Sequence, residues 1–232
     1  MNVDALVHQA WPAYEQVRHD GWILRHAGGV TKRANSVLPL GVPADLGAAI
    51  EAAEAFYAAR GQACAFSIGP GATPGLDAEL DRRGYARADP TVVMSGSVPG
   101  EPGHPVRVED RPWDAWTRTW WQVDGRYGDG LREAGRILTG VPARYAAVEE
   151  DGVPVAVGRG VPQGSTEDAT VGVYCMATLP SARRRGLARS VLRALAGGGR
   201  AYLVVTAGNA AAQALYRSEG LEPVAAYHYR VR

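Results

Sequence analysis

Residues 169–189 read ATVGVYCMATLPSARRRGLAR, and this stretch decides the predicted fold of the chain. Its first ten residues, 169–178, form a long apolar run, which predicts a central β-strand. A tight turn with three consecutive arginines follows, and a helix is expected over residues 185–195, ended by the glycines at 197–199. A strand that leads through a short turn into a helix is a basic unit of layered α/β folds.

The same reasoning predicts the elements on both sides of this unit. Toward the N-terminus we expect a hairpin from the extended runs 21–27 and 34–40, helices over 46–60 and 76–83, and strands over 63–68 and 88–94. Toward the C-terminus we expect a helix beginning near Pro112, a helix over 131–138 and a hairpin from 144–148 and 153–158, then a strand, a helix and a strand over 201–206, 210–219 and 223–231. The fold class is therefore α/β: a mixed sheet with helices on both faces.

Residues 95–105, SGSVPGEPGHP, interrupt these patterns. The stretch is rich in Gly, Pro and Ser, which is typical of a linker. We therefore expect an N-terminal domain over residues 1–95, a linker over 96–105 and a C-terminal domain over 106–232. The two parts end in a similar succession of strands and helices, which indicates a weak internal duplication.

The turn before the 185–195 helix has the chemistry of an anion site. The first turn of a helix leaves backbone N–H groups unpaired, and together with the helix dipole they favour a negative charge. Gly186 and the small Ala188 let a phosphate approach the backbone closely, and the arginines at 183–185 add positive charge. These features suit a pyrophosphate, although the turn alone is equally consistent with a solvated basic helix start.

A second motif lies downstream, where Asn209 is followed at fixed spacing by Ala212, Leu215, Tyr216 and Gly220. With this pair of motifs the sequence resembles the GCN5-related N-acetyltransferases, the GNAT superfamily. The resemblance covers residues 106–232 and is strongest over 171–221. It implies the GNAT fold, and it identifies residues 1–95 as similar to the degenerate N-terminal half of tandem GNAT proteins.

The resemblance also implies acyl-CoA, with acetyl-CoA as the default, as the cosubstrate of the C-terminal domain. Backbone groups on the central strand would bond the pantetheine arm, the arginine turn would hold the pyrophosphate, and Asn209 would contact the arm or order its loop. The implied cofactor-binding residues are Met176, Ala177, Thr178, Arg183, Arg184, Arg185, Gly186, Leu187, Ala188, Arg189, Asn209, Ala212 and Tyr216.

Tyr216 is the predicted catalytic residue. The resemblance implies that its hydroxyl lies near the thioester sulfur, where a phenol of pKa about 10 can give a proton to the leaving thiolate. A helix tyrosine packed on the sheet is the alternative. Many GNAT members carry a glutamate on the central strand as general base, whereas this chain has Gly172 there, with Tyr174 two residues on and on the same face. No base is assigned: Glu149 and Glu150 belong to a hairpin tip, Glu167 and Asp168 to a loop, and a water relay is equally possible.

Trp113, Trp116 and Trp120 recur at helical spacing, which predicts core packing. In GNAT enzymes the helix that carries them and the loop after it border the acceptor site. The candidate acceptor-binding residues are therefore Trp121, Asp124, Tyr127 and Tyr174, with Arg126 and Asp129 in the same loop. A solvated loop is the alternative. The run TKRANS at 31–36 could complete an acceptor pocket, but for Asn35 and Ser36 we favour hydrogen-bonded turn side chains.

Composition narrows the class of protein. The formal net charge is +1, so no basic field predicts nucleic acid or an acidic membrane as partner. The two cysteines lie in apolar runs and suit buried thiols, so neither a disulfide framework nor a metal site is expected. No signal peptide or membrane span is predicted, which places the protein in the cytoplasm.

These observations predict an N-acetyltransferase that moves an acetyl group to a primary amine of a small molecule. A non-catalytic acyl-CoA sensor, or a transferase of a longer acyl group, are the alternatives. The sequence leaves open whether the protein is a monomer or a homodimer.

Overall fold

The computed structural model describes residues 2–125, 128–165 and 168–232. They divide into two compact units. Unit one consists of residues 1–92, 132–140 and 225–232, and unit two of residues 93–131 and 141–224. Each unit is described separately below, and strands β5 (Ala86–Ser97) and β11 (Glu222–Val231) contribute residues to both.

Unit one contains the neighbouring strands β1-β2-β3-β4-β11 of a mixed sheet. Strands β1 and β2, β2 and β3, and β4 and β11 are antiparallel, whereas β3 and β4 are parallel. Besides β11 and the first part of β5, its elements are α1 (Val3–Ala10), β1 (Glu15–His19), β2 (Trp22–His26), the 3-10 turn Lys32–Ala34, β3 (Val37–Leu38), α2 (Leu46–Ala58), β4 (Ala65–Ile68), α3 (Leu76–Arg82) and most of α5 (Leu131–Leu138).

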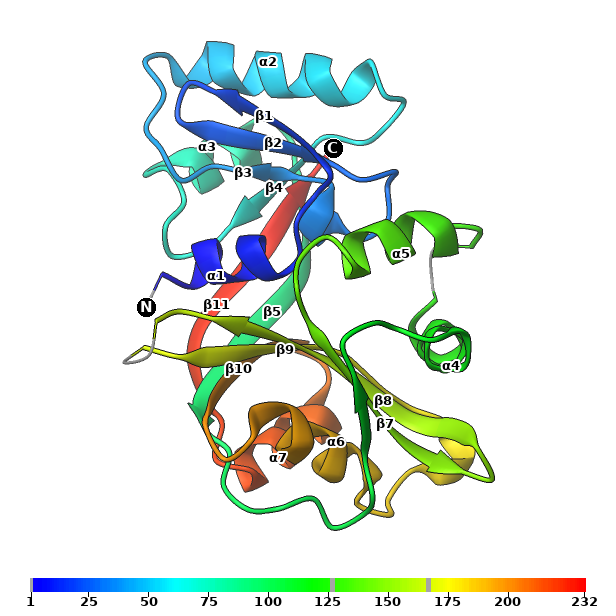
Figure 1. The fold of residues 1–232 in the computed structure, drawn as a ribbon. Helices are drawn as coiled ribbons and strands as arrows, with labels where there is room; N and C mark the ends of the chain where they lie inside the picture. The colour runs from blue at the N-terminus through cyan, green and yellow to red at the C-terminus, as the bar shows by residue number, and fades with distance from the viewer. Residues whose placement is uncertain (1, 126–127, 166–167) are drawn as a thin grey trace. The chain divides into compact units, whose positions relative to one another are not determined.

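The two faces of this sheet differ in chemistry because side chains alternate along each strand. Leu24, Val37 and Phe66 lie on the face that packs against α2 and α3, in one apolar core with Ile50 and Leu80. The next residue along each strand, Arg25, Leu38 and Ser67, faces the other way, toward α1. Figure 1 shows α1 and α2 on opposite sides of these strands.

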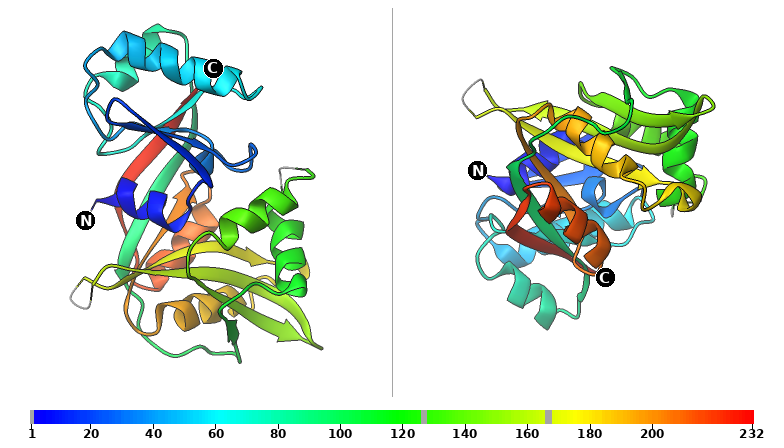
Figure 2. Two further views of the ribbon diagram at one scale, coloured as in Figure 1. Left: turned by 45° about the horizontal axis from the view of Figure 1, so that its top comes forward. Right: turned by 90° about the horizontal axis from the view of Figure 1, so that it is seen from below.

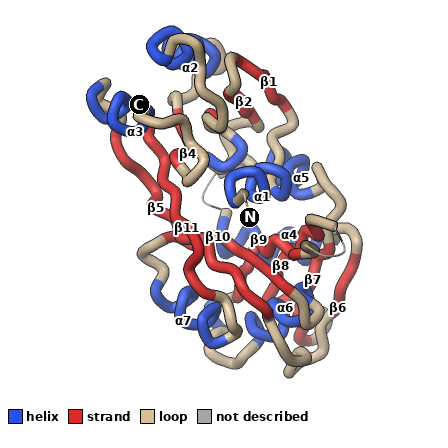
Figure 3. The backbone as a smooth tube through the Cα atoms, turned by 90° about the vertical axis from the view of Figure 1, so that its left-hand side faces the viewer, coloured by secondary structure: helices blue, strands red, loops and turns tan. Residues whose placement is uncertain are grey.

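Unit two has the strand order β5-β10-β9-β8-β7-β6. Its elements after β5 are β6 (Arg107–Glu109), α4 (Asp114–Asp124), β7 (Arg144–Glu150), β8 (Val153–Gln163), β9 (Thr170–Thr178), the 3-10 turn Pro180–Ala182, α6 (Leu187–Ala196), β10 (Arg200–Thr206) and α7 (Ala210–Ser218). Strands β6 to β9 are antiparallel in succession, and β10 runs parallel to β9. Helices α6 and α7 cover one face of these strands and α4 the other, as Figures 1 and 2 show, and Figure 3 follows the strands as neighbours.

The predicted α/β fold with a mixed sheet flanked by helices is confirmed. The predicted packing of the tryptophan stripe is also confirmed for Trp116 and Trp120, which lie on the buried face of α4. The indole of Trp116 donates to the carbonyl of Ala146 at 3.0 Å. Trp113 caps the helix instead, half-buried under the guanidinium of Arg107.

The predicted N-terminal hairpin is present as the antiparallel pair of β2 and β3, but this pairing is short and β2 has a second partner that was not predicted. Strand β2 pairs over its full length with β1, through a turn at Asp20 and Gly21, and only two residues of β3 pair with its other edge. The segment between β2 and β3 is irregular because Asn35 organises it: its amide accepts from the N–H groups of Ala27 and Gly29 and donates to the carbonyls of Val30 and Thr31. Asn35 is therefore a hydrogen-bonded turn side chain, as favoured from the sequence.

Strand β5 extends over residues 86–97 and so passes through Pro90 and into the stretch at 95–105. Ser95 is buried there, and its hydroxyl donates to the carbonyl of Ala201 at 3.0 Å. The compact units also exchange segments, since α5 and the end of β11 belong mostly to unit one. These contacts join residues that are far apart in the chain, so they cannot be predicted from the local composition of the sequence.

Replacement of Ile50 by Ala tests the core of unit one. Ile50 is fully buried between α2 and the sheet, so we expect Ile50→Ala to lower the free energy of unfolding by about 2–5 kcal/mol, and Ile50→Val by about 0.5–1.5 kcal/mol. Urea denaturation followed by circular dichroism measures both. Glu51→Ala, at the exposed neighbouring position, should change it by no more than about 0.5 kcal/mol. Equal effects at 50 and 51 would contradict the described packing of α2.

Candidate functional site

Strand β9 is distorted near its C-terminal end. Against β8, the register shifts between Val157 and Arg159, so that Cys175 and Met176 of β9 together oppose the single residue Gly158. Cys175 has a φ of +56°, which is uncommon for a residue with a side chain. This is a β-bulge, a feature that bends a strand and redirects its side chains.

Strands β9 and β10 part at the same place. Their parallel register runs from Ala201↔Val171 to Leu203↔Val173, although β9 continues to Thr178 and β10 to Thr206. The last residues of β9 keep their pairing with β8, with Ala177 opposite Val157 and Thr178 opposite Ala156. On the side that faces β10, the last residues of β9 therefore offer backbone groups to a ligand. The implied pantetheine contacts Met176, Ala177 and Thr178 belong to this part of the strand.

The turn between β9 and α6 has two residues in the left-handed region. Arg184 has a φ of +66°, and Gly186, the N-cap of α6, has a φ of +80°. No side chain caps the helix. In the described chain, the backbone N–H groups of residues 184–189 donate to no carbonyl or side chain, and the turn at 183–186 is exposed. An exposed group of free N–H donors at a helix N-terminus suits an anion.

The side chains of most arginines in this turn are already engaged. Arg183 donates to the carbonyl of Thr178 at 3.2 Å, and Arg185 forms an ion pair with Glu150 at 2.6 Å. Arg189 pairs with Glu219 at 2.5 Å, while Arg184 contacts no partner in the part of the chain described. The positive charge available to a ligand is therefore centred on Arg184.

Glu219 anchors two of these interactions. Its side chain is 1% exposed and bridges Arg189 and Arg193 on successive turns of α6. A buried carboxylate with two guanidinium partners fixes the end of α7 against α6. This role could not be predicted from the sequence, because a glutamate at the C-terminal end of a helix is usually exposed to solvent.

Helix α7 carries the second motif. Asn209 is its N-cap, and the side-chain oxygen accepts from the N–H of Ala212 at 3.1 Å, so Asn209 orders the loop before the helix. Tyr216 lies on the buried face and is 8% exposed. Burial raises the pKa of its phenol to about 12. Within the described residues its hydroxyl has no hydrogen-bond partner, so it is protonated at neutral pH and available to a ligand.

Tyr174, predicted to face the acceptor, belongs to a chain of hydroxyls. Its hydroxyl lies 3.0 Å from that of Tyr202, which donates to Gln163 at 2.6 Å. The glycine at the position of the family's usual glutamate follows from this arrangement: a Cβ on Gly172 would stand 2.6 Å from the Tyr202 hydroxyl oxygen. Tyr202 is thus a feature that the sequence analysis missed, and only the parallel pairing with Gly172 discloses it.

The other acceptor candidates are placed only in part. Trp121 and Asp124 are half-buried at the C-terminal end of α4, and Trp121 stacks edge-on against Trp120 at 5.5 Å. Asp129 and Asp168 are exposed. Tyr127, Arg126 and Glu167 lie outside the described residues.

Comparison with known proteins shows the family of this chain. Residues 2–232 match the family described as "Probable histone acetyltransferase Rv0428c C-terminal". The chain belongs to this family. YobR of Bacillus subtilis (strain 168), described as an uncharacterized N-acetyltransferase, is 27% identical over 99% of this chain and 97% of its own length. Rv0428c of Mycobacterium tuberculosis, described as a probable histone acetyltransferase, is 33% identical over 52% of this chain and 39% of its own length.

Solved structures share the fold over the whole chain. A GCN5-related N-acetyltransferase from Kribbella flavida has a TM-score of 0.68 at 21% identity, covering 100% of this chain and 96% of that one. A tandem GNAT protein from the clavulanic acid biosynthesis pathway has a TM-score of 0.62 at 14% identity, covering 100% and 87%. The resemblance to the GNAT superfamily is thus confirmed, and the chain is an acetyltransferase of GNAT type.

Residues 2–125, 128–165 and 168–232 of this GNAT protein contain neither a membrane-spanning helix nor a metal-binding cluster. None of their helices combines the length and apolar character needed to cross a membrane. Their His, Cys, Asp and Glu side chains form no group of three that could hold a metal ion.

Gly172→Ala tests the fit between β9 and Tyr202. The added methyl group would lie 2.6 Å from the Tyr202 hydroxyl oxygen and 2.9 Å from a ring carbon of Tyr174, so we expect a loss of about 1–3 kcal/mol in unfolding free energy. Urea denaturation measures it. Gly208→Ala is the matched control, because nothing lies within 4 Å of the added group, and should cost at most about 0.5 kcal/mol. An unchanged unfolding free energy for Gly172→Ala would show that Tyr202 does not lie against Gly172.

Proposed function

We propose that this GNAT protein transfers the acetyl group of acetyl-CoA to a primary amine of a small molecule. The observation that carries the proposal is the buried, protonated phenol of Tyr216, whose hydroxyl has no partner in the described chain. The hydroxyl oxygen is not among the unpaired side-chain atoms that are shielded from solvent, so a ligand can reach it. A ligand sulfur that needs a proton gives this group a function.

The turn before α6 supports the cosubstrate. Free N–H groups at residues 184–189 and the positive end of the α6 dipole suit the pyrophosphate, which is the anionic part of coenzyme A. Arg184 adds a charge that no carboxylate in the described segments neutralises. Ala188 and Gly186 keep the approach to the backbone open, since nothing but the ring of His104, at 3.8 Å, would meet a Cβ on Gly186.

The parting of β9 from β10 supports the position of the pantetheine arm. Past Val173, the β10 side of β9 has backbone donors and acceptors that the parallel register does not use. An extended amide chain can bond to such a strand edge in the manner of an added strand. The bulge at Cys175 changes the direction of β9 at this point, which gives Met176 and Thr178 their proposed role as backbone contacts.

The chemistry then requires few groups. The amine nitrogen forms a bond to the thioester carbonyl carbon as the carbon–sulfur bond breaks, and the thiolate leaves. Tyr216 gives its phenolic proton to that sulfur, and the proton lost by the amine returns to the phenolate through water. Holding both reactants in place supplies much of the rate acceleration. We assign no side chain as general base, in keeping with Gly172 in place of a glutamate.

Trp121, Asp124 and Tyr174 are the proposed contacts of the acceptor. An aromatic face beside a carboxylate attracts a cationic amine before it loses its proton. Tyr127 is retained as a sequence-based candidate. We propose action in the cytoplasm, without nucleic acid, metal or membrane as partner, and a monomer or homodimer as the assembly.

Release of free thiol from acetyl-CoA tests the proposed reaction. We expect turnover with members of a panel of small primary amines, and slower or no turnover when succinyl- or octanoyl-CoA replaces acetyl-CoA. Histone tail peptides are included as acceptors, because relatives carry that description. Faster acetylation of the peptides than of every small amine, or thiol release only from a longer acyl-CoA, would overturn the proposed substrate class.

Tyr216→Phe tests the general acid. The substitution removes only the hydroxyl, so we expect an unchanged Kd for coenzyme A by calorimetry and a kcat lowered about 10²-fold, because general acid catalysis typically supplies a factor of this size or more. Tyr85→Phe, which also removes a buried tyrosine hydroxyl but in unit one, should leave both quantities unchanged. Wild-type turnover in Tyr216→Phe would remove this residue from the mechanism.

A further inference from the structure

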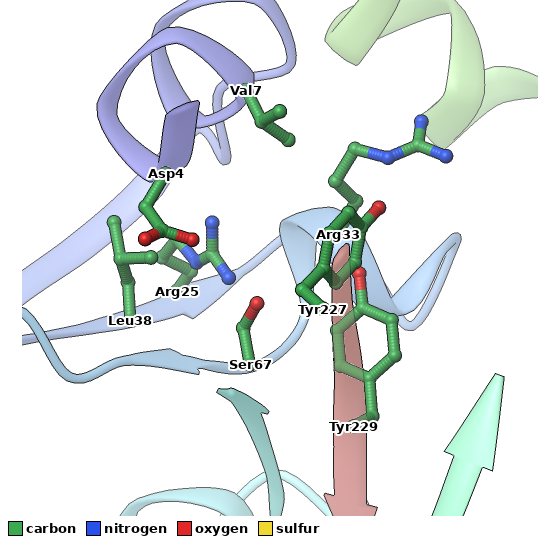
Figure 4. Close-up of a pocket in the computed structure, with 8 residues that line it drawn as sticks. All are labelled: Asp4, Val7, Arg25, Arg33, Leu38, Ser67, Tyr227 and Tyr229. Carbon is green, nitrogen blue, oxygen red and sulfur yellow. The ribbon is translucent and has the colours of Figure 1, made fainter. Parts of the chain in front are cut away.

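The hollow between α1 and the strands of unit one is too small for a solute. Figure 4 shows Arg25, Ser67 and Tyr229 among the side chains that line it. The guanidinium of Arg25 is 2% exposed and donates to the carbonyl and the hydroxyl of Ser36 at 2.9 and 2.7 Å, so it joins β2 to the segment before β3. The remaining space has room for about one water molecule, so this hollow is part of the fold and not a ligand site.

The predicted linker, in contrast, reaches the candidate acyl-CoA site of unit two. Its residues 98–104 lie along helix α6. Val98 is buried, and its N–H donates at 3.0 Å to the carbonyl of Gly199, beyond the C-terminal end of the helix. Further along the linker, the carbonyl of Glu101 accepts from Nη1 of Arg193 at 3.2 Å. The linker therefore runs antiparallel to α6, toward the turn that precedes this helix.

His104 is the linker residue that contacts the turn. Its neighbour Gly103 lies over the next turn of α6, where an added Cβ would stand 3.9 Å from the hydroxyl oxygen of Ser190. Nε2 of His104 lies 3.0 Å from the carbonyl oxygen of Arg185. A carbonyl oxygen can only accept, so Nε2 carries the proton and donates. Among the residues that the structure describes, no other group donates to this carbonyl.

This hydrogen bond fixes the direction of the peptide group between Arg185 and Gly186. The described chain contains no cis peptide bond, and the C=O and N–H of a trans peptide point in opposite directions. Because His104 holds the carbonyl oxygen on one side of the turn, the N–H of Gly186 points to the other side. That N–H is one of the donors proposed for the pyrophosphate, and it donates to no group in the described segments.

Gly186 by itself does not favour this orientation over the reverse one. Rotating the peptide group by half a turn would exchange the positions of the C=O and the N–H, and would take Gly186 from its φ of +80° to a negative φ. Glycine populates both regions about equally well. After the rotation, the carbonyl oxygen of Arg185 would face the phosphate and repel it. A donor that holds the carbonyl therefore favours the orientation that binds an anion.

We infer that His104 is a positioning residue of the candidate acyl-CoA site. By donating to the carbonyl of Arg185, it keeps the N–H of Gly186 directed at the pyrophosphate. The inference rests on the proposed use of acetyl-CoA as the cosubstrate. It gives residues 98–104 a function beyond joining two parts of the chain, because their contacts with α6 place the imidazole. His104 acts through the backbone and takes no part in the acyl transfer itself.

Two replacements of His104 in the full chain test this role. His104→Leu removes the donor, so we expect the Kd for coenzyme A, measured by calorimetry, to rise about 3- to 10-fold, the effect of losing one hydrogen bond. In His104→Gln the side-chain amide can donate to the same carbonyl, so the affinity should stay at the wild-type value. The KM for acetyl-CoA should follow the Kd, with kcat unchanged. His19→Leu, at a half-buried histidine of unit one, is the matched control and should change neither quantity.

The backbone amide resonance of Gly186 gives a direct readout by NMR. We expect saturating coenzyme A to shift it in the wild type and in His104→Gln, and to shift it less in His104→Leu. Pantetheine, which has no phosphate, should bind the wild type and His104→Leu equally. Absence of coenzyme A binding to the wild type would contradict the proposed cosubstrate. If the wild type binds, then equal affinity in His104→Leu, equal weakening in His104→Gln, or an equal loss of pantetheine binding would overturn the role of His104.

Discussion

The separation of β9 from β10 after Val173 is the constraint on which the candidate acyl-CoA site depends. Two parallel strands that stayed paired would use every backbone group along their common edge. Because the register ends at Leu203↔Val173 and β9 bulges at Cys175, Met176 to Thr178 have no ladder partner on the β10 side among the described residues, and they lead directly into the turn before α6. The strand edge, the free N–H groups and the buried face of α7 are thereby brought into one unit of the chain.

Charge around the turn is organised as much by carboxylates as by arginines. Glu150 holds Arg185, and the buried Glu219 holds Arg189 and Arg193, so three of the guanidinium groups near α6 serve the fold. The number of arginines in the sequence therefore predicts a stronger positive potential than a ligand would meet in the structure. The backbone amides are not neutralised by carboxylates in this way, because a helix always leaves its first N–H groups without internal partners.

The sequence predicts most of this region because its signals are local. The apolar run at 169–178, the glycine at 186 and the asparagine at 209 place β9, α6 and α7 within two residues of their observed ends. Strand β1 could not be predicted in this way because its residues are polar and mostly exposed. Strand β3 has only two residues, which is too short for a recognisable pattern. The bulge, the Tyr202 contact with Gly172 and the burial of Glu219 depend on pairings between distant segments. The same is true of Arg25, which reads as an ordinary strand arginine until Ser67 and Tyr229 appear beside it.

The depth of Tyr216 has a consequence for how this chemistry responds to acidity. With its pKa near 12, the phenol keeps its proton at neutral pH. The proposed general acid is then always in its protonated form. The rate would depend on the fraction of acceptor molecules that have already lost their ammonium proton. Among competing metabolites, weakly basic amines would be favoured at neutral pH, a selection by the substrate's own acidity that adds to the contacts proposed for the acceptor.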